Sequence, residues 1–87
     1  MIKRKKNIVQ HKENGGYVVL NMDNGDFYGL YDISQEIWDM LDGDNNVDDI
    51  VEKLNKKYSE ISAAEIRSDV EAFVNKLMSV ELVEIYG

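Results

Sequence analysis

The stretch that decides the fold lies between residues 17 and 38 and reads YVVLN at 17–21, Asn24-Gly25, FYGLY at 27–31 and DISQEIW at 32–38. The first and third of these runs are rich in β-branched and aromatic residues, which favour strands. The Asn-Gly pair between them is typical of a two-residue hairpin turn, which would place Met22 opposite Phe27. Asp32 is a candidate N-cap, and Ile33 and Ile37 then recur at helical spacing. The stretch therefore predicts a β-hairpin that leads directly into a helix.

The elements on either side follow from similar patterns. Residues 8–10 form an apolar run before the turn residues 13–16, which predicts another strand and a three-stranded antiparallel meander. Asn46 is a candidate cap for a second helix, and Ser62 and Glu65 have the capping-box spacing that opens a third. Apolar residues at helical spacing are predicted to be buried: Val47, Ile50, Val51, Leu54 and Tyr58 in the second helix, and Ile66, Val70, Phe73, Leu77 and Val80 in the third.

The predicted order is three strands followed by three helices (βββααα), an α+β domain with a winged-helix-like layout. The chain has 87 residues, so we expect a single domain over 1–87. Residues 1–6 are basic and are predicted to form a solvated terminal tail. Residues 82–86 alternate like a short strand, which either closes the sheet or frays.

Charge and composition exclude several classes of partner. The net charge is −7, and four of the ten basic residues lie at positions 3–6, so the remainder carries six basic against seventeen acidic residues, or −11. Such a body repels phosphate, which disfavours nucleic acid as a partner. The chain has no cysteine, and no apolar segment is long enough to cross a membrane. We therefore expect a cytoplasmic protein with neither a nucleic-acid nor a membrane partner.

No set of residues is arranged for bond-breaking chemistry. Residues 42–49 resemble a calcium loop, but Val47 stands where the loop needs glycine and Lys53 where it needs glutamate. A helix-capping loop is the better interpretation. His11 is the only histidine and has no nucleophile motif to pair with it. The sequence thus predicts no catalytic residues, no metal site, no cofactor and no enzyme.

Two surfaces instead favour peptide binding. The apolar arc of the third helix spans roughly 160°, wider than the usual core-facing stripe of about 100°, which predicts a partly exposed strip along Val70, Val74 and Met78 beside Arg67. Complete burial of that arc is the alternative. The aromatic strand at 27–31 has no lysine or proline to protect its edge, so a peptide could add to it as a further strand. Gly29 marks either the approach of another backbone or room for Trp38.

Several segments, taken in order, resemble the PqqD-like peptide chaperones, the recognition elements for ribosomally synthesised and post-translationally modified peptides. They are YVVLN at 17–21, the aromatic strand with Leu30, Asp32-Ile33-Ser34 leading to Ile37-Trp38, Leu41-Asp42-Gly43, VDDIV at 47–51, and the run Asp69-Val70, Phe73-Val74 and Leu77.

This resemblance implies a non-catalytic, winged-helix-like domain that binds the leader segment of a precursor peptide. The domain would present the leader to a maturation enzyme such as a radical SAM enzyme, a cyclase or a leader peptidase. The leader would lie along the third strand and pack on the third helix. The peptide-binding residues it implies are Phe27, Tyr28, Gly29, Leu30, Tyr31, Arg67, Val70, Val74 and Met78.

Two other functions stay open at this point. A DNA-binding winged-helix regulator agrees with the helix count, although the third helix is not basic. A homodimer that pairs through the exposed strand edge is the other alternative.

Overall fold

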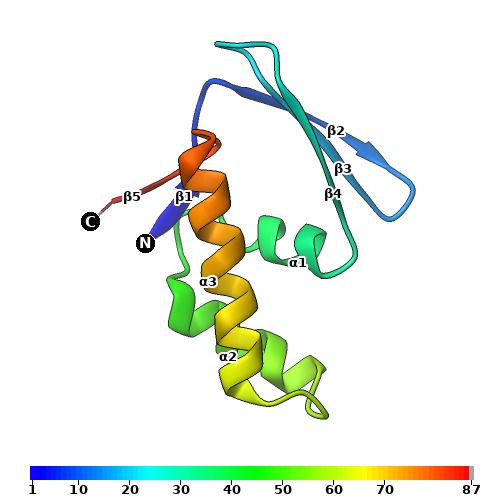
Figure 1. Ribbon diagram of the computed structural model, residues 1–87, viewed down its shortest axis with the longest axis vertical. Helices are drawn as coiled ribbons and strands as arrows, with labels where there is room; N and C mark the ends of the chain where they lie inside the picture. The colour runs from blue at the N-terminus through cyan, green and yellow to red at the C-terminus, as the bar shows by residue number, and fades with distance from the viewer. Residues whose placement is uncertain (87) are drawn as a thin grey trace.

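The computed structural model describes residues 1–86, which form two small antiparallel sheets and three helices. In chain order the elements are β1 (Ile2–Arg4), β2 (Ile8–Glu13), β3 (Gly16–Asn21), β4 (Phe27–Tyr31), α1 (Ile33–Asp39), α2 (Val47–Lys57), α3 (Ala63–Ser79) and β5 (Val83–Ile85). The three-stranded sheet β2-β3-β4 lies to one side of the helices, and α1 follows β4 directly (Figure 1). This arrangement confirms the α+β prediction of three meandering strands followed by three helices.

The turn between β3 and β4 differs from the prediction. Leu20, rather than Met22, lies opposite Phe27, so the expected two-residue turn is wrong. The side-chain oxygens of Asn21 and Asn24 each accept a hydrogen bond from the backbone amide two residues further along. These Asx turns build a longer connection than the Asn-Gly pattern alone predicts.

The three predicted N-cap positions precede the three helices, and two of them carry the expected side-chain cap bond. Asn46 caps α2 by accepting from Asp49 N at 2.9 Å, and the Asp49 carboxylate accepts from Asn46 N at 3.0 Å. Ser62 caps α3 by accepting from Glu65 N at 3.2 Å. Asp32 stands at the N-cap position of α1, as predicted, but its side chain makes no cap hydrogen bond. The φ of Asp32 is 56°, whereas a residue that caps through its side chain typically has an extended backbone.

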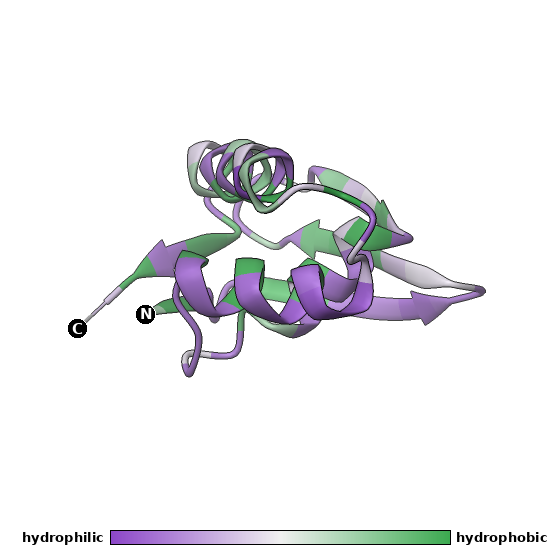
Figure 2. Cartoon of the chain, turned by 90° about the horizontal axis from the view of Figure 1, so that it is seen from below, coloured by the Kyte–Doolittle hydropathy of each residue, from purple (hydrophilic) through white to green (hydrophobic). Residues whose placement is uncertain are grey.

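The core lies between the inner face of the β2-β3-β4 sheet and the helices. Trp38 is fully buried, and its Nε1 donates to Gln10 Oε1 at 2.9 Å, which joins α1 to β2. Hydrophobic and hydrophilic residues alternate along α2 and α3, as expected for helices that bury one side (Figure 2). The buried hydrophobic residues are Ile2, Val19, Leu30, Ile37, Trp38, Leu41, Ile50, Val51, Leu54, Ile66, Val70, Val74, Leu77, Leu82 and Val83.

The two ends of the chain pair with each other. The predicted solvated tail is wrong for Ile2–Arg4, which forms β1 and pairs antiparallel with β5. Ile2 is buried in the core, and Arg4 Nη1 donates to Trp38 O at 2.9 Å. The mostly basic composition of residues 1–6 gave no indication of these two contacts. Because β5 pairs with β1, it leaves the edge of β4 uncovered.

Among residues 1–86, no helix combines the length and apolar character needed to cross a membrane.

Candidate functional site

β4 is an edge strand, and within residues 1–86 no segment pairs with its outer side. In an antiparallel ladder, residues that bond to one neighbour alternate with residues whose amide and carbonyl groups point the other way. Asn21 N donates to Asp26 O at 2.8 Å, so the backbone groups of Asp26 point toward β3. In the observed register, the backbone groups of every second residue after it, Tyr28 and Leu30, point toward β3 as well. The residues whose backbone groups point to the free edge are therefore Phe27, Gly29 and Tyr31.

The ring of Tyr31 lies across the outer face of the sheet, over two glycines. A Cβ atom on Gly29 would lie 2.8 Å from Tyr31 Cε2, and one on Gly16 would also collide with the ring. The Tyr31 hydroxyl donates to Glu13 Oε2 at 3.1 Å, a bond that raises the pKa of the phenol. Gly29 therefore makes room for Tyr31, and the interpretation that it makes room for Trp38 is wrong.

The predicted residues of α3 do not form an exposed strip beside β4. Val70 and Val74 are only 0% and 2% exposed, so the prediction of an accessible apolar surface is wrong at both positions. Arg67 forms an ion pair with Asp48 of α2, so its side of the helix turns toward α2. Met78 lies three turns along that same side. The structure brings residues 27–31 to a free edge and directs the Arg67 side of α3 elsewhere.

The side of α3 that faces β4 carries Asp69 and Phe73. Near the end of the helix, Val80 O accepts a hydrogen bond from Asn21 Nδ2 of β3 at 3.2 Å. In its first half, Asp69 lines the same pocket as Ile33, which lies two residues after the end of β4. Because Phe73 lies one turn after Asp69, it falls on the same side. β4 is the strand of its sheet nearest to α3 (Figure 1).

A small apolar pocket of about 30 Å³ opens where the three helices meet, close to the end of β4. This volume is far below that of ligand pockets, so the hollow can receive the end of a single side chain and not a cofactor. Sequence patterns placed several of its residues on buried helix faces but could not show that these faces leave a shared hollow. The lining residues are Ile33, Ile37, Leu54, Tyr58, Ile61, Ile66, Asp69 and Val70.

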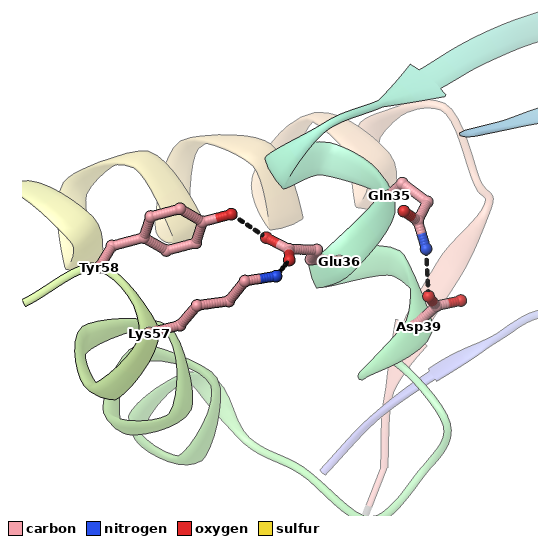
Figure 3. Close-up of polar contacts among 5 residues, drawn as sticks. All are labelled: Gln35, Glu36, Asp39, Lys57 and Tyr58. Atoms are coloured by element: carbon pink, nitrogen blue, oxygen red, sulfur yellow. Dashed lines mark hydrogen bonds and ion pairs between the residues drawn. The ribbon is translucent and has the colours of Figure 1, made fainter. Parts of the chain in front are cut away.

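Glu36 holds one wall of this pocket in place (Figure 3). Its carboxylate accepts hydrogen bonds from the Lys57 ammonium and from the Tyr58 hydroxyl, the latter at 2.7 Å. The Lys57 bond is the main cause that lowers the pKa of Glu36; Tyr58 acts in the same direction, and burial opposes both. Donation to Glu36 raises the pKa of Tyr58. The cluster joins α1 to the end of α2 and fixes Tyr58 beside the pocket.

We expect Glu36 to stabilise the fold at neutral pH and to lose that effect in acid. Its native pKa lies below the ordinary value of 4.5, so its contribution is present above that value and disappears as the pH falls through the lowered native pKa. Urea unfolding of the wild type and Glu36→Gln should differ at about pH 7, and the difference should shrink progressively as the pH falls below the ordinary pKa of 4.5.

The matched control is Glu52→Gln, because the pair between Glu52 and Lys56 is highly exposed and should contribute little at either pH. A stability difference between wild type and Glu36→Gln that stays constant with pH would contradict the assignment.

The acidic loop before α2 is explained by local structure. Asp42 Oδ1 accepts from Asp44 N at 3.0 Å, and this backbone hydrogen bond is the main cause that lowers the pKa of Asp42. Asn46 and Asp49 complete the cap of α2. Within the described chain, no three His, Cys, Asp or Glu side chains gather closely enough to hold a metal ion. The interpretation of this loop as a helix cap is confirmed.

Comparison with known proteins identifies the family. Residues 16–83 match the family model described as coenzyme PQQ synthesis protein D (PqqD). The chain belongs to the PqqD family. Members of this family are non-catalytic peptide-binding proteins, which confirms the prediction that the chain is not an enzyme. No curated protein matches the sequence.

Two solved structures resemble this PqqD-family chain over nearly its whole length. TbiB1 in complex with the TbiA(beta) leader peptide is 25% identical, with a TM-score of 0.87 and 98% of each chain covered. Lasso peptide synthetase B1 complexed with its leader peptide is 20% identical, with a TM-score of 0.86, and the match covers 97% of this chain and 98% of that one. At that lower identity the second structure supports the fold alone.

Proposed function

We propose that this PqqD-family chain binds the leader segment of a precursor peptide and holds it for a modifying or processing enzyme. The observation that carries the proposal is the unpaired edge of β4, where the backbone groups of Phe27, Gly29 and Tyr31 are available to an added strand. The complex of TbiB1 with the TbiA(beta) leader peptide supports it, because TbiB1 shares 25% identity and the whole fold.

The leader would lie between β4 and α3. Main-chain hydrogen bonds to β4 would supply affinity, and alternate side chains would point inward and outward. The inward side chains would meet Tyr28 and Phe73, both half-buried, and then the pocket beside Ile33. Buried Leu30 would support this surface from below.

Charge on α3 gives little support to the alternative of a DNA-binding regulator. Glu65, Asp69 and Glu71 are exposed on this helix, and Arg67 is paired with Asp48. DNA recognition through a helix needs basic groups that neutralise phosphate, and this helix presents mainly carboxylates. No separate nucleic-acid function is proposed.

The test needs a candidate precursor, which is sought among short open reading frames beside this gene, and a synthetic peptide of its leader segment. Titration calorimetry with the synthetic leader should give a Kd of about 1 μM or below. A complete absence of binding would contradict the proposal. Sedimentation of the chain alone provides the check on the homodimer, because self-pairing through β4 would raise the mass with concentration and compete with the leader.

Replacing Ile33 with aspartate is expected to weaken leader binding about tenfold, because the change removes apolar surface and places a charge at the pocket mouth. Ile33 lines the pocket but is 38% exposed, so the fold should tolerate the substitution. Fluorescence anisotropy of a labelled leader measures the change.

Ile85→Asp is the matched control for Ile33→Asp. Ile85 is 63% exposed and lies on β5, outside the proposed groove. Equal losses of affinity in the two variants would show that the pocket is not part of the binding surface.

A further inference from the structure

A row of apolar side chains crosses the outer face of the three-stranded sheet, opposite the core. Val9, Leu20 and Phe27 are directly opposite one another on β2, β3 and β4. Val9 and Phe27 are 52% and 72% exposed, and half-buried Leu20 lies outside the core cluster. Neighbouring apolar side chains on one face stabilise strand pairs, and this row ends at the free edge with its most exposed member.

The rest of the outer face along β4 is already occupied. The ring of Tyr31 covers Gly29 and Gly16, and its hydroxyl is held by Glu13. A strand added to β4 would therefore meet two exposed side chains on this face, the Tyr31 ring, whose hydroxyl is held by Glu13, and Phe27, which is more exposed (72% against 43%).

We propose that the outer face provides a second specificity contact, in which the added leader strand places an aliphatic or aromatic side chain opposite Phe27. That side chain would extend the Val9, Leu20 and Phe27 row by one strand. The inference rests on the proposed addition of the leader to β4. It assigns the leader two apolar positions on opposite faces of the strand, one beside Phe27 and one directed inward toward the pocket at Ile33.

Side chains along a strand project alternately to the two faces of the sheet. Directly opposite residues of adjacent strands project to the same face, so the leader residue that pairs with the Phe27 backbone also projects outward. In that position it would cover part of the exposed Phe27 ring. A polar residue there would leave the ring in water and forgo the contact.

The test uses the synthetic leader peptide whose binding to the wild type has been measured, and two matched variants of the full chain. Phe27→Ser removes the edge member of the row, and Val9→Ser removes a member that β3 and β4 separate from the added strand. Both side chains are exposed, so both variants should keep the wild-type circular dichroism spectrum. We expect Phe27→Ser to weaken binding about fivefold and Val9→Ser to stay within about twofold of wild type.

A serine scan of the apolar leader residues completes the test. At one leader position, the serine substitution should weaken binding to the wild type but should weaken binding to Phe27→Ser little further. Such non-additivity in a double-mutant cycle is expected for two side chains in direct contact. Normal leader binding by Phe27→Ser, or the absence of any coupled position, would overturn the inference and leave the proposed function standing. Failure of the leader to bind the wild type would overturn both.

Discussion

Methylation of every second amide nitrogen in the docked part of the leader is expected to weaken its binding at least about tenfold per position. An added strand directs alternate N–H groups toward β4, where they meet the backbone groups of Phe27, Gly29 and Tyr31. A methyl group at such a nitrogen removes the donor and fills the space between the strands. The intervening N–H groups point away from β4, so their methylation should cost less than about threefold.

Singly methylated synthetic leaders, titrated into the wild-type chain, provide this measurement. The intervening positions are the internal control, because methylation there changes the conformational preference of the peptide without touching β4. Equal losses at neighbouring positions would contradict strand addition, and so would the absence of any loss along the whole docked segment.

Trp38→Ala is expected to lower the free energy of unfolding by about 3–5 kcal/mol. The side chain is fully buried and its Nε1 bonds to Gln10, so truncation leaves a cavity and an unpaired acceptor between α1 and the sheet. The indole also lies beneath the guanidinium of Arg4, 5.6 Å from the ring centroid. Small domains are typically stable by only about 5–15 kcal/mol, so this variant should be at the limit of folding.

Urea unfolding followed by circular dichroism measures this effect, since Trp38 is the only tryptophan and its fluorescence is lost in the variant. Trp38→Phe is the matched comparison, because it keeps most of the apolar volume and loses only the indole hydrogen bond. A loss below about 1 kcal/mol in Trp38→Ala would contradict the central packing role of this residue.

Local sequence patterns predicted most of the helices and strands, because interactions between residues a few positions apart determine where these elements begin and end. The caps at Asn46 and Ser62 depend on side chains and amides three residues apart. The turn at Asn24-Gly25 was mispredicted because Asn21, outside the pair, also bonds to the backbone. The start of α1 directly after Asp32 was predicted correctly, but the positive φ of Asp32, and with it the missing side-chain cap, was not.

The candidate site was only half predictable. The aromatic run at 27–31 and its lack of protective residues identified the open edge, because edge protection is a property of composition. The burial of Val70 and Val74 was not predictable, since helical periodicity does not reveal how many neighbours pack on a wide apolar arc. Pairing of β1 with β5 joins the two ends of the described chain, for example Ile2 with Ile85, and no local pattern encodes it.

Amide exchange measured by NMR shows whether the leader adds to β4 as a strand. In the free chain, the N–H groups of Phe27, Gly29 and Tyr31 should exchange readily, whereas those of Tyr28 and Leu30 should be protected by β3. Saturation with the leader should protect the first three amides and leave the other two as they were. Unchanged exchange at Phe27, Gly29 and Tyr31 in the saturated complex would contradict the account.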